Sequence, residues 1–86
     1  MAALEEMAQK ENRIIVYPNP ASDKISVSIP EQFKGLKYTL CDQFGKEIFK
    51  GNLLETTNTI DLTNLASGIY FLSVEGMAAV ERVVKQ

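Results

Sequence analysis

Histidine and tryptophan are both absent from the 86-residue sequence, and cysteine occurs once, at Cys41. Without histidine the chain cannot build a Ser-His-Asp or Cys-His catalytic arrangement, or a zinc site that uses imidazole ligands. A single cysteine excludes an internal disulfide and a thiolate cluster for zinc or iron–sulfur. Cys41 has no histidine to activate it, so we expect a buried structural thiol. These absences predict no catalytic residue, no cofactor and no metal site, and therefore no enzyme.

Long apolar runs and a surplus of positive charge are also missing. No segment approaches the roughly 18 consecutive apolar residues of a transmembrane helix, so we expect no transmembrane segment. The first residues have neither the basic region nor the apolar region of a signal peptide, so none is expected there. The formal net charge is −2, and because binding to phosphates needs a basic surface, we expect no nucleic-acid partner.

What the sequence does contain is a series of short alternating segments separated by turn residues. In residues 24–29, Ile25, Val27 and Ile29 point to one side and two serines to the other, as in a half-buried antiparallel strand. Short segments of this kind, separated by turn residues at regular intervals, predict an all-β fold, an immunoglobulin-like antiparallel β-sandwich of about seven strands. The other expected strands are residues 14–17, 36–42, 47–51, 57–62, 69–75 and 79–85.

The first 13 residues differ in composition from the rest. They are rich in Ala, Glu, Gln and Lys, with Leu4 and Met7 at helical spacing. An isolated helix of fewer than about 12 residues is marginal in water. We therefore interpret residues 1–13 as a linker or a piece of a longer parent protein, with a short helix as an alternative, and residues 14–86 as one small domain.

Residues 61–74 carry the strongest structural pattern. Leu62 and Leu65 are three residues apart, so both can point inward from one tight turn. Gly68 follows, where a left-handed conformation suits a chain leaving the turn. The next six residues are nearly all apolar, which predicts a strand buried on both faces. Tyr70 stands where a tyrosine corner would place it, with its hydroxyl bonded back to the preceding turn.

The remaining polar groups admit structural explanations. Asp61, Thr63 and Asn64 could offer oxygen atoms to a cation, but capping of the turn explains the same residues better. Arg82 and Lys85, on the last expected strand, are typical of exposed charges that guard a sheet edge. The chemistry of the residues alone therefore reveals no function.

Several short blocks complete the pattern. They are Val-Tyr-Pro-Asn-Pro-Ala at 16–21, Gly-Lys at 45–46, Ile-Asp-Leu at 60–62 with Leu65, Ser-Gly-Ile-Tyr-Phe-Leu at 67–72, and Arg-Val-Val-Lys at 82–85. In this order and spacing the blocks resemble the C-terminal sorting domain of the type IX secretion system, type A, also called the Por secretion tail. The resemblance covers residues 14–86, and the combination of blocks is specific where no single block would be.

The resemblance implies an immunoglobulin-like sandwich at the end of a larger secreted protein of a Gram-negative bacterium. The parent cargo would lie on its N-terminal side. The domain would direct this cargo from the periplasm through the outer-membrane translocon to the cell surface. There a sortase-like protease usually removes the domain and attaches the cargo to an anionic lipopolysaccharide, although some members keep the domain within the attachment machinery.

The resemblance also assigns roles to residues. Arg82, Val83, Val84 and Lys85 become candidates for recognition by the translocon. Their strand is expected at a sheet edge, which could pair with a receptor or with a second copy in a homodimer. The motif residues with structural roles are Tyr17, Pro18, Asn19, Pro20, Gly45, Lys46, Asp61, Leu65, Gly68 and Tyr70.

One alternative function belongs to a different class. A stand-alone adhesive or carbohydrate-binding module would share the predicted sandwich. Such modules usually present aromatic side chains on a binding face, whereas the three tyrosines of this chain fall mostly on core-type positions. The sequence therefore favours the sorting domain.

Overall fold

A computed structural model describes residues 13–78 and 80–86 of the chain, so most of the segment interpreted as a linker lies outside the described residues. Seven β-strands and one short 3₁₀ helix, η1 (Glu31–Phe33), make up the regular structure of this part. Each strand ends within one residue of a predicted segment. The strands are β1 (Ile15–Tyr17), β2 (Lys24–Ser28), β3 (Lys37–Asp42), β4 (Glu47–Asn52), β5 (Thr57–Asp61), β6 (Gly68–Val74) and β7 (Val80–Lys85).

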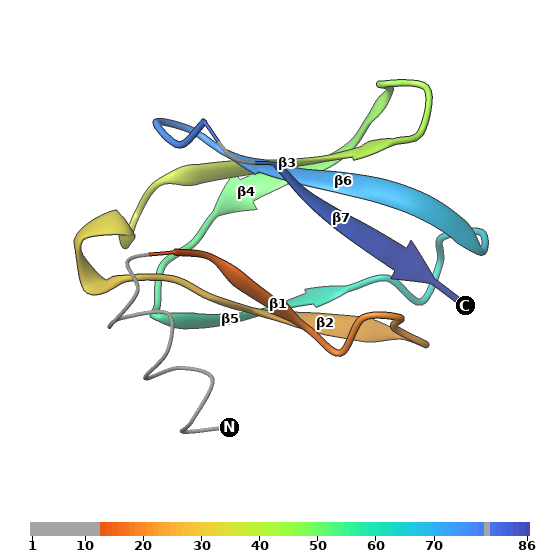
Figure 1. Cartoon of the computed structure of the whole chain (residues 1–86), viewed down its shortest axis with the longest axis horizontal. Coiled ribbons are helices and arrows are strands. Elements are labelled where there is room, and N and C mark those ends of the chain that lie inside the picture. Colours follow the sequence, from red (N-terminus) through yellow and green to blue (C-terminus); the bar gives the residue numbers. More distant parts are fainter. Residues whose placement is uncertain (1–12, 79) are drawn as a thin grey trace.

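The strands form two antiparallel sheets that face each other (Figure 1). One has three strands in the order β1-β2-β5, and the other has four in the order β4-β3-β6-β7. The chain thus places its first, second and fifth strands in one layer and the others in the second layer, as immunoglobulin-like sandwiches do. The predicted fold class is confirmed. Within the described ranges, no helix has the length and apolar character needed to cross a membrane.

The core lies between the two sheets and follows the alternation of the sequence. Ile25 and Val27 of β2 face Leu40, Leu72 and Val83 of the four-stranded sheet, and the side chains of all five are fully buried. Burying one such side chain stabilises the fold by roughly 1.5–3 kcal/mol. The core of this small domain therefore depends strongly on each of these residues.

The prediction that β6 is buried on both faces is wrong. Tyr70, Leu72 and Val74 are buried between the sheets, whereas Phe71 on the opposite face is 36% exposed. Cys41, which pairs with Phe71 across β3 and β6, is only half-buried, so the expected buried thiol is also wrong. The physical reason is shared: among the described residues no third layer covers the outer face of the four-stranded sheet.

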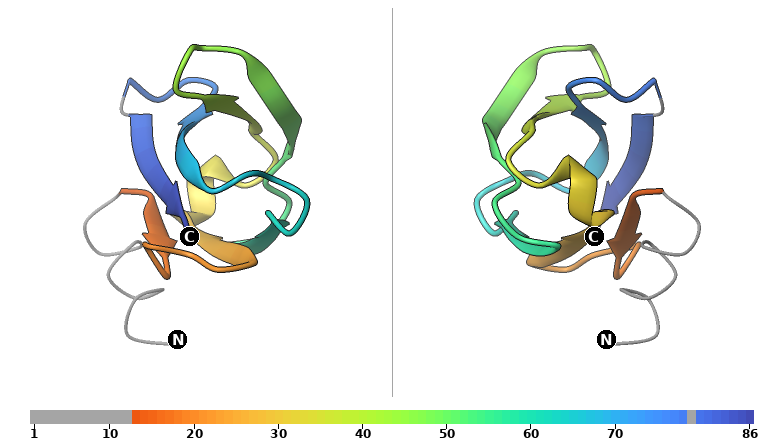
Figure 2. Two further views of the ribbon diagram at one scale, coloured as in Figure 1. Left: turned by 90° about the vertical axis from the view of Figure 1, so that its right-hand side faces the viewer. Right: turned by 90° about the vertical axis from the view of Figure 1, so that its left-hand side faces the viewer.

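One side of the sandwich is closed by the chain itself. After β1 the chain turns at Pro-Asn-Pro, whose two X-Pro peptide bonds are both cis, and Ala21 then bridges Lys85 in parallel. The Ala21 N–H donates to the Val84 carbonyl, and the Gln86 N–H donates to the Ala21 carbonyl, both at 2.8 Å. Figure 2 shows this turn against the end of β7. On the opposite side, the edges of β4 and β5 have no strand pairing between them.

Candidate functional site

The turn before β6 is built as a tyrosine corner. The Tyr70 side chain is 7% exposed, and its hydroxyl donates to the Ala66 carbonyl at 2.6 Å. The turn is closed by the Leu65 N–H, which donates to the Leu62 carbonyl at 2.9 Å. Gly68 then starts β6 with a φ of +156°, on the positive side that favours glycine. The predicted corner is therefore present, and it braces the start of the central strand β6.

The Pro-Asn-Pro-Ala block covers the outer edge of β7. The Asn19 side-chain amide donates to the Arg82 carbonyl at 2.7 Å, and its carbonyl oxygen accepts from the Val84 N–H at 2.9 Å. Ala21 continues the pairing through its backbone. We call residues 19–21 the edge cover. From the sequence, Asn19 and Pro20 were expected only to have structural roles; the missed signal is that an asparagine amide offers one donor and one acceptor, like a peptide group.

The four residues predicted for translocon recognition do not form one surface. Val83 is fully buried in the core, so it cannot touch a partner while the domain is folded. Arg82 is exposed, and Val84 and Lys85 are half-buried. β7 does lie at a sheet edge as predicted, but the edge cover occupies its outer hydrogen-bonding groups from Arg82 onward. Strand pairing at this place would first have to displace the cover.

The Gly-Lys block forms a rigid hairpin between β3 and β4. One carboxylate oxygen of Asp42 accepts from the N–H groups of Phe44 and Lys46, each at 2.9 Å. Gly45 has a φ of +86°, which other residues adopt only with strain. This geometry holds Phe44 in the open, with 86% of its surface exposed. Phe44 was not among the predicted site residues, although an aromatic residue in the short stretch between the strands expected at 36–42 and 47–51 is a visible signal.

Two further motif residues have local structural partners. The Tyr17 hydroxyl lies 3.4 Å from the hydroxyl of the fully buried Ser28. The Asp61 carboxylate accepts from the N–H of Thr63 at 2.9 Å and from its hydroxyl. These bonds, the hydroxyl bond first, hold the pKa of the Asp61 carboxyl below its usual value. Asp61 therefore caps the turn that follows β5, as predicted, and stays ionised at neutral pH.

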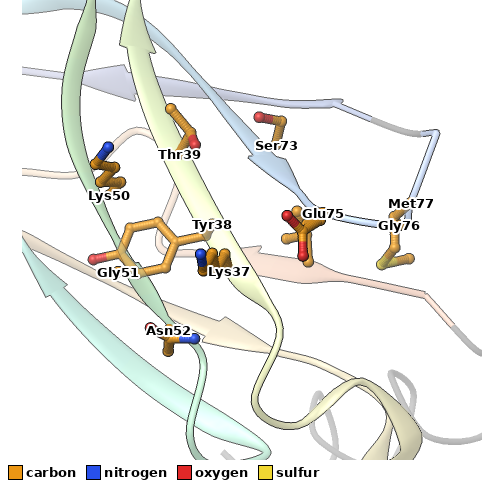
Figure 3. A pocket seen from close by; sticks show the side chains of 11 residues that line it. Lys37, Tyr38, Thr39, Lys50, Gly51, Asn52, Ser73, Glu75, Gly76 and Met77 are labelled. Carbon is orange, nitrogen blue, oxygen red and sulfur yellow. The ribbon is translucent and has the colours of Figure 1, made fainter.

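A hollow of about 560 Å³ opens on the four-stranded sheet (Figure 3). Its lining carries the cations Lys37 and Lys50 and the anion Glu75. The Tyr38 ring lies against Gly51, where a Cβ would come within 3.0 Å of it, so glycine makes room for the ring. Mixed charges on an open sheet can hold a polar ligand weakly, but the sequence supplies no histidine here to act as a general base.

The residues that carry the sequence pattern are thus brought together by the fold. The first and last blocks, 63 residues apart, meet where Asn19 covers Arg82. A scan against protein-family models matches the secretion system C-terminal sorting domain over residues 15–86. The chain belongs to this family. None of the curated proteins matches the chain. The family match runs from Ile15, the first residue of β1, to Gln86, so every described strand lies inside it.

The tyrosine corner gives the sorting domain a testable stabilising contact. Tyr70→Phe removes only the hydroxyl that donates to the Ala66 carbonyl. We expect a loss of about 1 kcal/mol in the free energy of unfolding, measured by urea denaturation. Tyr38→Phe is the control, because the half-buried Tyr38 ring lies against Gly51 and not in the corner. If Tyr70→Phe and Tyr38→Phe unfold at the same urea concentration, the bond from the Tyr70 hydroxyl to the Ala66 carbonyl adds no stability.

The depressed pKa of Asp61 predicts a pH dependence. A carboxyl with a lower pKa in the folded state adds stability above its unfolded pKa of about 3.9, and loses it as the pH falls through the folded value. Asp61→Asn should therefore be less stable than the parent at neutral pH and equal to it in strong acid. Thr63→Val should raise the pKa of Asp61, as measured by NMR titration. An unchanged pKa would contradict the assigned cause.

Proposed function

We propose that this sorting domain directs a parent protein, joined to its N-terminal side, from the periplasm through the outer membrane by the type IX secretion system. The observation that carries the proposal is the family match over residues 15–86, the same residues that form the sandwich. The motif blocks contribute mainly to the core, the turns and the edge cover. What the blocks specify is therefore a folded shape, and we propose that the export machinery recognises the folded domain.

Exposed apolar side chains mark where such recognition would occur. Phe71 and Val80 are 36% and 54% exposed on the outer face of the four-stranded sheet, next to the exposed Arg82. Phe44 projects from the hairpin of the same sheet. Phenylalanine and arginine are among the residue types enriched at protein interfaces. These residues take the place of the buried Val83 in our assignment of the recognition surface.

The second step of the proposal is release at the cell surface. By its resemblance to the family, the domain would be removed there by a sortase-like protease that cuts on the N-terminal side of the sandwich. The first strand begins at Ile15, and Ile14 is already buried in the core. Proteases cut exposed chain more readily than paired strands. A cut that separates cargo from domain therefore has to fall before Ile14.

The test is a reporter fusion. The whole chain is joined to the C-terminal end of a periplasmic reporter enzyme, in a bacterium that has the type IX system and in a mutant that lacks its translocon. We expect reporter activity outside the first strain, at its surface or in the medium, and only in the periplasm of the second. Cleavage would shorten the exported fusion by somewhat less than the 9.6 kDa of the chain. Retention of a folded fusion in the periplasm of both strains would overturn the proposal.

A further inference from the structure

The four edge strands of the sandwich are protected to different degrees. Natural sheets shield their edges with short strands, prolines, charged residues, bulges or covering segments, because an open edge pairs with other chains. The three-residue β1 is followed directly by Pro18, and the edge cover occupies the outer edge of β7. β4 carries Glu47 and Lys50, and its register with β3 shifts between Leu40 and Cys41. Three edges are therefore shielded.

The fourth edge, β5, has the fewest of these devices, and its one charged residue is Asp61, at the end of the strand. Its sequence, Thr-Asn-Thr-Ile-Asp, contains no proline and no lysine or arginine, and its five pairs with β2 run without a register shift. The Ile29 N–H donates to the Thr56 carbonyl, and the Leu62 N–H donates to the Asp23 carbonyl. In an antiparallel ladder these bonds recur at every second residue. The residues between them, Thr59 among them, therefore turn their backbone groups to the outer edge.

A second hollow lies directly beside this edge. It measures about 350 Å³ and is lined by Tyr38, Phe49, Thr59, Ile60, Asp61 and Asn64. The aromatic rings come from the four-stranded sheet and the others from β5 and the turn after it, so the hollow lies on the side where β4 and β5 are not paired. Its lining includes two aromatic residues and one charged residue, Asp61. A long side chain with a positive end fits that combination, since its stem can lie on the rings.

We propose that the edge of β5 binds an extended segment of a protein of the export machinery, which adds a strand to the three-stranded sheet. In this mode of binding, main-chain hydrogen bonds supply affinity and pockets for alternate side chains supply specificity. A lysine or arginine of the added strand occupies the hollow beside Asp61. A second copy of β5 is a poorer occupant, because its five residues include no cation. The inference rests on the proposed function and adds a second partner surface, on the three-stranded sheet, to the one around Phe71.

Binding is tested with a defined probe. The peptide Ac-Thr-Val-Thr-Lys-Thr-Val-Thr-NH₂ is titrated into the ¹⁵N-labelled 86-residue chain, with the same peptide carrying Glu in place of Lys as the control. We expect slower exchange of the Thr59 and Asp61 amide protons, and shifts confined to β5 and the hollow. The Lys peptide should bind about three- to tenfold more tightly than the Glu peptide, as expected for an exposed ion pair against a repulsive one. No protection of these amides, or protection elsewhere, overturns the proposal.

The edge is then blocked in the reporter fusion. Thr59→Pro removes an outward N–H, which an edge strand tolerates, and Thr59→Lys places a guarding charge on the same exposed position. Gln43→Lys, exposed on the hairpin, is the control of equal charge. We expect export to fall at least about tenfold for the folded Thr59 variants and not for the control, which corresponds to about 1.4 kcal/mol of binding.

The outcomes separate the inference from the proposed function. If the parent fusion is exported and both Thr59 variants are exported equally well, the β5 edge is not the docking site, although the sorting function stands. If the parent fusion is not exported, the proposed function itself fails.

Sedimentation of the free chain shows whether a second copy of the chain, and not a protein of the export machinery, pairs with the β5 edge. A dimer that Thr59→Lys dissociates would assign the edge to a second copy and overturn the partner proposed here.

Discussion

Deleting residues 83–86 is expected to unfold the sandwich and, for that reason, to abolish export. The deletion removes the fully buried Val83, whose burial is worth roughly 1.5–3 kcal/mol. It also removes the bonds of Val84 and Gln86 to the edge cover and the last pairs of β7 with β6, each worth about 0.5–1.5 kcal/mol. Small domains have a total stability of only about 5–10 kcal/mol. The loss is therefore comparable with the whole stability of the domain.

Circular dichroism and a melting curve of the truncated chain check this expectation before any export assay. Arg82→Glu is the matched control at the same strand, because an exposed charge contributes about 1 kcal/mol or less to folding. It should leave the melting temperature nearly unchanged, so that any fall in its export reports on recognition. A truncated chain that melts like the parent would show that the last strand is dispensable for folding. Only in that case could its lost export be assigned to a missing docking motif.

The fold could be predicted because its main determinants are local. Alternating residues such as Ile25 and Val27 define which side of a strand is buried, and turn residues such as Gly45 define where strands end. The corner at Tyr70 was predictable for the same reason, since its partner, Ala66, lies only four residues away. Strand positions and the tyrosine corner therefore follow from spacing along the chain.

The errors concern contacts that depend on the order of strands in the sheets. An apolar run such as 69–74 has the same pattern whether one face or both are covered, and the exposure of Phe71 is fixed by the absence of a third layer from the described fold. The alternation along β7 places Val83 and Val84 on opposite faces of the strand, but only the stacking of the two sheets shows that the Val83 side faces the core. The candidate recognition surface could therefore not be predicted from residues 82–85 alone.

The contact between the edge cover and β7 is the clearest example of a contact hidden from the sequence. Asn19 and Arg82 are 63 residues apart, and Asn19 binds backbone groups, so the side chains of Arg82 and Val84 carry no sign of the contact. A Pro-Asn-Pro segment is typical of a turn in any fold. The structure adds that this turn also protects the edge of the last strand, which changes where a partner strand can bind.

Replacing Asn19 tests this role of the turn. Asn19→Ala removes both side-chain bonds to β7, and we expect a loss of about 1–2 kcal/mol in the free energy of unfolding. Asn19→Asp keeps the acceptor for the Val84 N–H but turns a carboxylate oxygen toward the Arg82 carbonyl. At neutral pH this repulsion should make Asn19→Asp at least as unstable as Asn19→Ala. In both variants the Val84 amide proton should exchange faster than in the parent, and the exposed β7 edge should promote association between copies.

The pH dependence distinguishes lost hydrogen bonds from general damage to the turn. We expect the repulsion from the Arg82 carbonyl to outweigh the bond from the Val84 N–H, so that the pKa of the introduced carboxyl in the folded state is raised above the unfolded value of about 3.9. Its protonated form can donate to the Arg82 carbonyl. A raised folded pKa means that stability is present below the unfolded pKa and is lost as the pH rises through the folded pKa. Asn19→Asp should therefore approach the parent when urea denaturation of both is compared below about pH 3, while Asn19→Ala stays destabilised. If Asn19→Asp is less stable than the parent by the same free energy at neutral pH and below about pH 3, the N–H of the Asn19 side chain does not stabilise the contact with β7. If Asn19→Ala matches the parent in both stability and Val84 exchange, the edge is held by the backbone of Ala21 alone.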